Sequence, residues 1–195
     1  MTSSPSPAVP VLNIANVLTV VRILMVPFFV WFLLLDDGRD GLFRWLAVLV
    51  FAVAIYTDKL DGDLARSRGL ITDFGKIADP IADKLLIGSA LVMLSVLGEL
   101  WWWVTIVILV REIGITLLRF AVIRYGVMPA SRGGKLKTVV QTVAILLFLI
   151  PLQSIAGDWA WWPAAAVMAA AVVITVVTGV DYVVQAIRLR AAARS

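Results

Sequence analysis

Residues 58–83 read DKLDGDLARSRGLITDFGKIADPIAD, a stretch that places acidic residues beside small ones in an otherwise apolar chain. Asp58 and Asp61 are three residues apart, and Asp79 and Asp83 are four apart, so each pair projects from one face of its helix. The four carboxylates can therefore converge between two neighbouring helices. Pro80 marks either the first turn of the second helix or a kink in a longer helix that begins near residue 73.

Four carboxylates near a membrane surface need compensation, because like charges and the loss of water both disfavour the ionised form. A divalent cation would supply that compensation. The chain contains no cysteine and no histidine, so the ligands would all be oxygen atoms. Such ligands select hard ions such as Mg²⁺, Mn²⁺ or Ca²⁺ and exclude a thiolate zinc site. Ions held in this way bridge phosphates well, and one carboxylate remains to accept a proton.

The composition around this stretch excludes a soluble globular domain. The 195 residues are 62% hydrophobic and 15% charged, with a mean hydropathy of +0.98. A transmembrane helix needs roughly 20 apolar residues, and six stretches approach or exceed this length. They lie near 16–35, 42–56, 81–97, 100–124, 136–153 and 159–187. The sequence therefore predicts an all-α, polytopic integral membrane protein with six transmembrane helices.

Basic residues gather in the connections after the second and fourth stretches and at the C-terminus. Because Lys and Arg are retained on the cytoplasmic side, we expect both termini, these connections and the acidic site to be cytoplasmic in the cell membrane. The expected organisation is a short leader (1–15), a six-helix membrane domain that carries the chemistry (16–190) and a tail (191–195).

The acidic stretch also carries a family resemblance. Read as Asp-x-x-Asp-Gly-x-x-Ala-Arg, eight residues, Gly-x-x-x-Asp-x-x-x-Asp, positions 58–83 match every fixed place of the CDP-alcohol phosphotransferase signature. The resemblance implies a six-helix membrane enzyme, usually a homodimer among membrane lipids, that transfers a phosphatidyl-type group from a CDP-linked lipid to an alcohol and releases CMP. It also implies two bound Mg²⁺ or Mn²⁺ ions.

The resemblance assigns roles residue by residue. Asp58, Asp61 and Asp79 would be metal ligands, with Asp83 as ligand or neighbour and as the general base. The CDP portion would be held by Gly62, Ala65, Arg66 and Gly75. The residue chemistry agrees, since Arg66 can donate to phosphate oxygens and the small residues admit a nucleotide.

Further segments resemble the bacterial branch of the family that uses sn-glycerol 3-phosphate and makes phosphatidylglycerol phosphate. They are Asn16, Thr19 and Arg22 with Pro27, then 72–76, 111–112, and 134–138 with Gln141. The expected substrates are thus CDP-diacylglycerol and sn-glycerol 3-phosphate, with no nucleic-acid partner. Related branches that use inositol phosphate or phosphatidylglycerol share several of these segments, so both acceptors stay open as alternatives.

Two arginines, Arg111 and Arg119, lie inside an otherwise apolar stretch, where an unpaired cation costs roughly 2.5–3.5 kcal/mol. With Lys135 and Lys137 they can form a cytoplasmic pocket for the phosphate of the acceptor. The alternatives are that Glu112 pairs with one arginine internally and that the lysines anchor the membrane surface. Polar residues near the start of the first stretch, at 16, 19 and 22, either border the site or cap the helix.

A divalent-cation transporter would also place acidic residues in apolar helices. Its acids would lie near the membrane midplane, whereas these cluster at the expected cytoplasmic helix ends. A purely structural membrane protein would leave the spacing of the acids without a purpose.

Overall fold

The computed structural model describes residues 13–35, 40–70, 72–123 and 132–192, and this part of the chain is helical without strands. Its helices are α1 (Ile14–Leu35), α2 (Leu42–Arg68), α3 (Asp73–Val96), α4 (Trp102–Val122), α5 (Arg132–Leu149), α6 (Leu152–Ala156), the 3-10 helix η2 (Asp158–Ala160) and α7 (Trp161–Ala192). The predicted all-α class is confirmed. Most of the predicted leader and tail lies outside the described residues.

Each of the six long helices includes most of one predicted apolar stretch, and α2 and α3 extend well beyond theirs. By length and composition, two segments qualify as membrane spans among the described residues, namely α1 and Asp158–Ala191. The other long helices include charged residues within their length, as α2 and α3 do at the acidic stretch. Six membrane crossings therefore stay a prediction from the sequence.

The polar connection predicted between the second and third stretches is much shorter than expected. Helix α2 continues to Arg68 and ends at Gly69, whose φ of 64° is left-handed and suits glycine. Helix α3 begins at Asp73 with Thr72 as its N-cap, and the Thr72 side chain accepts a hydrogen bond from the backbone N–H of Gly75. Pro80 consequently lies inside α3. Both acidic pairs therefore lie on regular helix.

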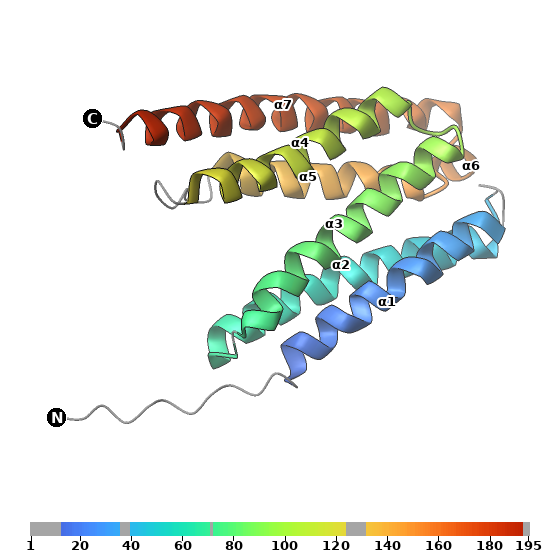
Figure 1. Ribbon diagram of the computed structural model, residues 1–195. Helices are drawn as coiled ribbons and strands as arrows, with labels where there is room; N and C mark the ends of the chain where they lie inside the picture. The colour runs from blue at the N-terminus through green and yellow to red at the C-terminus, as the bar shows by residue number, and fades with distance from the viewer. Residues whose placement is uncertain (1–12, 36–39, 71, 124–131, 193–195) are drawn as a thin grey trace.

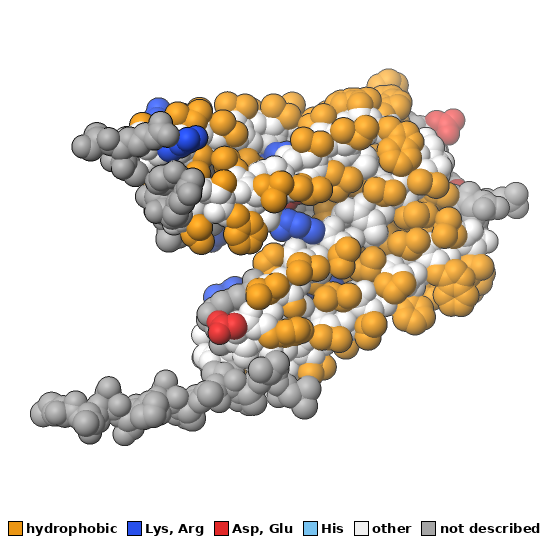
Figure 2. Space-filling model, in the orientation of Figure 1, with side chains coloured by type: hydrophobic (Ala, Val, Ile, Leu, Met, Phe, Trp, Pro, Cys, Tyr) orange, Lys and Arg blue, Asp and Glu red, His pale blue; other side chains and the backbone are white. Residues whose placement is uncertain are grey.

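The helices form two layers, α1–α2–α3 and α4–α5–α7 (Figure 1). The layers meet near α6 and diverge toward the end where α2 passes into α3. The shared core contains fully buried side chains from both layers, including Phe29, Phe51, Leu91, Ile108 and Ile145. Hydrophobic side chains also cover the outer surface (Figure 2), as expected for helices that face lipid.

A buried arginine joins the layers at the end where they meet. Arg44 of α2 is 2% exposed, and its Nη1 and Nη2 donate to the two Glu99 carboxylate oxygens at 2.7 and 2.5 Å. Its Nε donates to the carbonyl oxygen of Leu149 at 2.7 Å, and Nη2 also donates to that of Phe148 at 2.8 Å. This bidentate contact secures α5 and the end of α3 to α2. The layers can diverge at the opposite end because they are held together here.

Candidate active site

The acidic residues of α2 and α3 surround one buried guanidinium from α1. Arg22 is fully buried, and its Nη1 lies 2.7 Å from Asp58 Oδ1 and 3.1 Å from Asp83 Oδ1. Its Nη2 contacts Asp61 Oδ2. The structure therefore brings three of the four predicted carboxylates together, as the spacing indicated. Of the two sequence interpretations of Arg22, the structure favours the one in which it borders the site, and it places Arg22 at the centre of the acids, which the sequence did not predict.

Asp61 is the most enclosed of these acids, with a side chain 4% exposed, whereas those of Asp58 and Asp83 are 41% and 51% exposed. Asp61 lies beyond the apolar part of α2, which the sequence places at 42–56. Burial raises the pKa of the Asp61 carboxyl to about 6; Arg22 opposes this shift, while Asp58 and Asp79 add to it. The Arg22 cation thus favours the ionised form of Asp61.

The fourth acid, Asp79, is held by the polar face of α1. The hydroxyl of Thr19 donates to Asp79 Oδ1 at 2.5 Å. One turn earlier, the Asn16 amide nitrogen donates to the Thr72 hydroxyl at 2.8 Å. Asn16 and Thr19 are both buried. They therefore border the site, as one of the two sequence interpretations held, and they attach α1 to the start of α3.

Gly75 is required by the close approach of α1 to α3. A Cβ atom at this position would lie 2.9 Å from Asn16 Oδ1 and 3.4 Å from Thr72 Oγ1. Real Cβ atoms essentially never come as close as the first of these distances. A side chain at position 75 would therefore displace the Asn16 amide, which is hydrogen-bonded to Thr72.

The acidic residues provide the donor chemistry of a hard divalent ion, because every available ligand atom is a carboxylate or hydroxyl oxygen. Among the described residues, no group of three acids is arranged around a common point so as to hold an ion. The reason is visible in the contacts, since the Arg22 guanidinium lies between Asp58, Asp61 and Asp83. The donor set fits a divalent ion, and Arg22 supplies the positive charge in this arrangement.

All four residues expected to hold the CDP portion line a single pocket of about 190 Å³, which we name the α1–α3 pocket. Its lining is Ala15, Asn16, Gly62, Ala65, Arg66, Leu70, Thr72, Gly75 and Asp79. The exposed Arg66 guanidinium donates to the exposed Asp63 carboxylate at 2.8 Å, so these two side chains form a surface ion pair. The predicted residues are thus assembled beside an acid of the cluster.

A second pocket of about 350 Å³, the α3–α5 pocket, is lined by α3 of one layer and by α4 and α5 of the other. Figure 2 shows the hollow between the layers, with Lys and Arg side chains on its walls. Its lining is Asp79, Pro80, Asp83, Lys84, Ile87, Gly88, Leu109, Glu112, Ile113, Lys137, Thr138, Gln141 and Thr142. Asp79 lines both pockets. Ligands in the two pockets would therefore both lie beside Asp79.

The four basic residues predicted for an acceptor phosphate occupy different positions. Lys137 lines the α3–α5 pocket and contacts Glu112 through its ammonium group. Lys135 is exposed. Arg111 and Arg119 are outside the pocket lining and turn toward α7. The structure thus places one of the four in the pocket wall.

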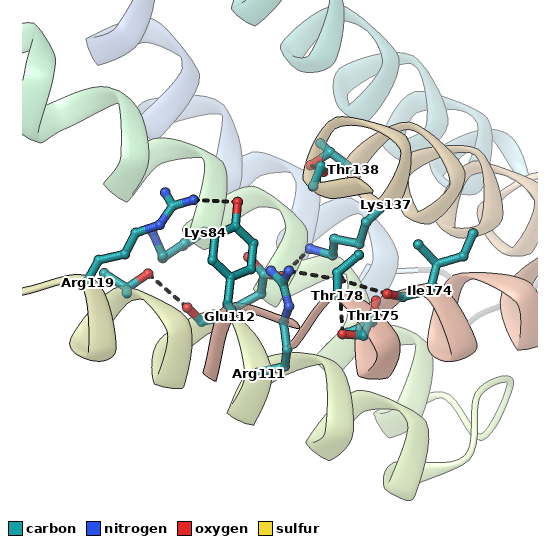
Figure 3. Close-up of polar contacts among 12 residues, drawn as sticks. Lys84, Arg111, Glu112, Arg119, Lys137, Thr138, Ile174, Thr175 and Thr178 are labelled. Atoms are coloured by element: carbon teal, nitrogen blue, oxygen red, sulfur yellow. Dashed lines mark hydrogen bonds and ion pairs between the residues drawn. The ribbon is translucent and has the colours of Figure 1, made fainter. Parts of the chain in front are cut away.

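Both arginines of α4 have partners within the protein (Figure 3). Arg111 donates to Glu112 at 3.2 Å and to the Thr178 hydroxyl at 3.0 Å. Arg119 donates to the Tyr182 hydroxyl at 2.8 Å, and its guanidinium lies 4.8 Å from the centre of that ring. The internal Glu112 pair is therefore confirmed for Arg111. Thr178 and Tyr182 were not predicted as partners, because neither residue stands out in the sequence of an apolar helix.

Comparison with known proteins gives consistent similarities over most of the chain. Residues 12–179 match the family described as CDP-alcohol phosphatidyltransferase. A protein of Mycobacterium tuberculosis (strain ATCC 25618 / H37Rv) named probable phosphatidylglycerophosphate synthase is 55% identical over 176 residues, which are 90% of this chain and 82% of that protein.

More distant similarities carry a second name, CDP-diacylglycerol--glycerol-3-phosphate 3-phosphatidyltransferase. The protein of that name from Bacillus subtilis (strain 168) is 34% identical, covering 87% of this chain and 93% of its own length. The one from Escherichia coli (strain K12) is 37% identical, covering 70% of this chain and 76% of its own length.

The contacts of Arg22 generate a test that needs no substrate. Arg22→Met should lower the free energy of unfolding by about 3 kcal/mol in detergent with a metal chelator, because buried Asp61 loses its counter-charge. Asp61→Asn added to Arg22→Met should restore part of that loss, since the unpaired charge is then removed. The measurement is a double-mutant cycle by denaturant unfolding, with the exposed Arg190→Met as the matched control. Strictly additive effects would contradict the shared contact.

Proposed function

The chain belongs to the CDP-alcohol phosphatidyltransferase family, and we propose that it transfers the phosphatidyl group of CDP-diacylglycerol to sn-glycerol 3-phosphate. The products are phosphatidylglycerol phosphate and CMP. The names of relatives that match most of the chain support this reaction. The observation that carries it is that Asp79 lines two pockets, one containing the signature residues and one containing Lys137.

In the proposed reaction, the α1–α3 pocket holds the CDP portion of the donor. Arg66 donates to phosphate oxygens in place of its present partner Asp63, and Gly62, Ala65 and Gly75 leave room for the nucleotide. The α3–α5 pocket holds sn-glycerol 3-phosphate. Lys137 and Lys84, which both line it, attract the acceptor phosphate.

The acceptor hydroxyl attacks the β-phosphorus of CDP-diacylglycerol, so that a new P–O bond forms as the P–O bond to CMP breaks. Asp83 lines the acceptor side, and its half-exposed carboxylate accepts the hydroxyl proton. We propose that Asp58, Asp61, Asp79 and Asp83 bind Mg²⁺ or Mn²⁺, as two ions. When bound, such ions neutralise charge on the pyrophosphate and on the leaving CMP.

Asp61→Asn and Asp83→Asn should each abolish CMP release while the protein stays inserted and folded. The first change removes a metal ligand and the second removes the proton acceptor, and loss of a general base costs on the order of 10²–10⁴ in rate. The assay is CMP release from CDP-diacylglycerol and sn-glycerol 3-phosphate across an Mg²⁺ titration, with Asp158→Asn in η2 as control.

Excess Mg²⁺ should partly rescue Asp61→Asn, whereas it should leave Asp83→Asn inactive. Near-normal turnover by Asp83→Asn would contradict its role as base. Substantial turnover by Asp61→Asn at ordinary Mg²⁺ would contradict the proposed metal site. A panel of acceptors in the same assay distinguishes sn-glycerol 3-phosphate from inositol phosphate and phosphatidylglycerol.

We propose that the four basic residues serve the acceptor phosphate unequally. Lys137→Gln should raise KM for sn-glycerol 3-phosphate about ten- to a hundredfold, because a charge-assisted hydrogen bond is worth about 1.5–3 kcal/mol. The KM for CDP-diacylglycerol should hardly change. Arg111→Gln, Arg119→Gln and Lys135→Gln should have smaller effects, since these side chains lie outside the pocket lining. Equal changes in both Michaelis constants for Lys137→Gln would indicate a structural role.

We also propose a multi-pass arrangement with both termini and the active site in the cytoplasm, supported by the basic residues in the flanking connections. The native chain has no cysteine, so single cysteines report the topology cleanly. Ser67→Cys at the end of α2 should resist an impermeant thiol reagent added to intact cells. Ser154→Cys in α6, at the opposite end of the molecule (Figure 1), should react. The reverse pattern would refute this orientation.

A further inference from the structure

The α3–α5 pocket contains a polar side chain that has no role in the fold or in the reaction described above. Gln141 belongs to α5 and lies four residues after Lys137, so the two side chains share a face of the helix. Asp83 lines the same pocket from α3. The pocket therefore combines a carboxylate, an ammonium group and a carboxamide.

Gln141 is only 3% exposed, and its Oε1 atom is buried with no hydrogen-bond partner among the described residues. A buried amide oxygen without a partner is unfavourable, and nearly all such atoms in proteins are paired. No hydrogen bond from the described part of the chain thus holds this oxygen in place. Because Gln141 lines the pocket, a ligand there can supply the missing partner once the amide turns toward it.

The proposed acceptor, sn-glycerol 3-phosphate, has three polar groups, and the pocket has a polar side chain for each of them. In sn-glycerol 3-phosphate the attacking hydroxyl and the phosphate are at opposite ends, where Asp83 and Lys137 serve them. The middle hydroxyl remains. A hydroxyl both donates and accepts hydrogen bonds, so it can pair with the oxygen or the nitrogen of a carboxamide.

We propose that Gln141 binds the secondary hydroxyl of the acceptor and thereby selects a hydroxylated three-carbon phosphate over its deoxy analogue. This inference rests on the proposed function, because it takes sn-glycerol 3-phosphate as the acceptor. Gln141 acts as a specificity-determining residue that contacts the substrate away from the reacting atoms. A site that hydrogen-bonds a substrate hydroxyl favours that substrate over the analogue without it, because only the hydroxylated substrate gains the hydrogen bond.

The experiment compares sn-glycerol 3-phosphate with 3-hydroxypropyl phosphate, which keeps the phosphate and the attacking hydroxyl and lacks only the middle one. The wild-type protein should prefer sn-glycerol 3-phosphate in kcat/KM by about ten- to a hundredfold. In Gln141→Met, a side chain of similar length without the amide, this preference should fall to nearly one. Turnover of 3-hydroxypropyl phosphate should hardly change.

Gln185→Met is the matched control, because Gln185 lies on α7 and donates to Asp181 of the same helix. It should keep the preference of the wild-type protein. An unchanged preference in folded Gln141→Met would overturn the inference. So would a wild-type preference below about threefold, a measurement that does not depend on the variant folding.

Failure of the proposed function gives a different result. The wild-type protein would then release no CMP with either three-carbon phosphate, whereas another acceptor class such as inositol phosphate would still give CMP. In that case the assignment of the middle hydroxyl to Gln141 is overturned together with the acceptor.

Discussion

The contact between Arg22 and three carboxylates is the interaction on which the site depends. Arg22 belongs to α1, Asp58 and Asp61 to α2, and Asp83 to α3, so one guanidinium joins the three helices of a layer. Without a cation the acids would repel one another in a poorly hydrated setting. The same helix face carries Asn16 and Thr19, which reach Thr72 and Asp79. Helix α1 is thus the polar support for the acids of its neighbours.

The two layers are arranged differently at the two ends of the molecule. Where the layers meet, Arg44 donates four hydrogen bonds, to Glu99 and to two backbone carbonyls, and these hold the layers together. Where the layers diverge, charged side chains line pockets and Asp79 is shared between them. A firm attachment at one end allows an opening at the other without loss of the core between the layers. A water-soluble acceptor and a lipid-linked donor can then approach the same carboxylates.

The cations of the second layer, of which Lys137 is buried, Arg111 half-buried and Arg119 exposed, show how a membrane protein limits the cost of charge. Glu112 accepts from Arg111 and contacts Lys137, while Arg119 rests on the ring of Tyr182 and bonds its hydroxyl. These partners offset the desolvation of the arginines. They also leave Lys137 as the basic residue of the four that borders the pocket. A charged residue in an apolar stretch therefore indicated a position with specific contacts. It did not distinguish a residue that lines a pocket from one that binds only other side chains of the protein.

The sequence by itself determined the helical membrane class, the shared faces of the acid pairs and the oxygen-only chemistry of the donors, because these follow from hydropathy, helical periodicity and composition. The resemblance to the signature also singled out Gly62, Ala65, Arg66 and Gly75, which all line the α1–α3 pocket. Only the tertiary structure decided that Arg22 enters the acidic cluster, that Arg111 and Arg119 turn toward α7, and that Gln141 faces the pocket. The physical reason is that periodicity sets the face on which a side chain lies, whereas the packing of distant helices sets what that face meets.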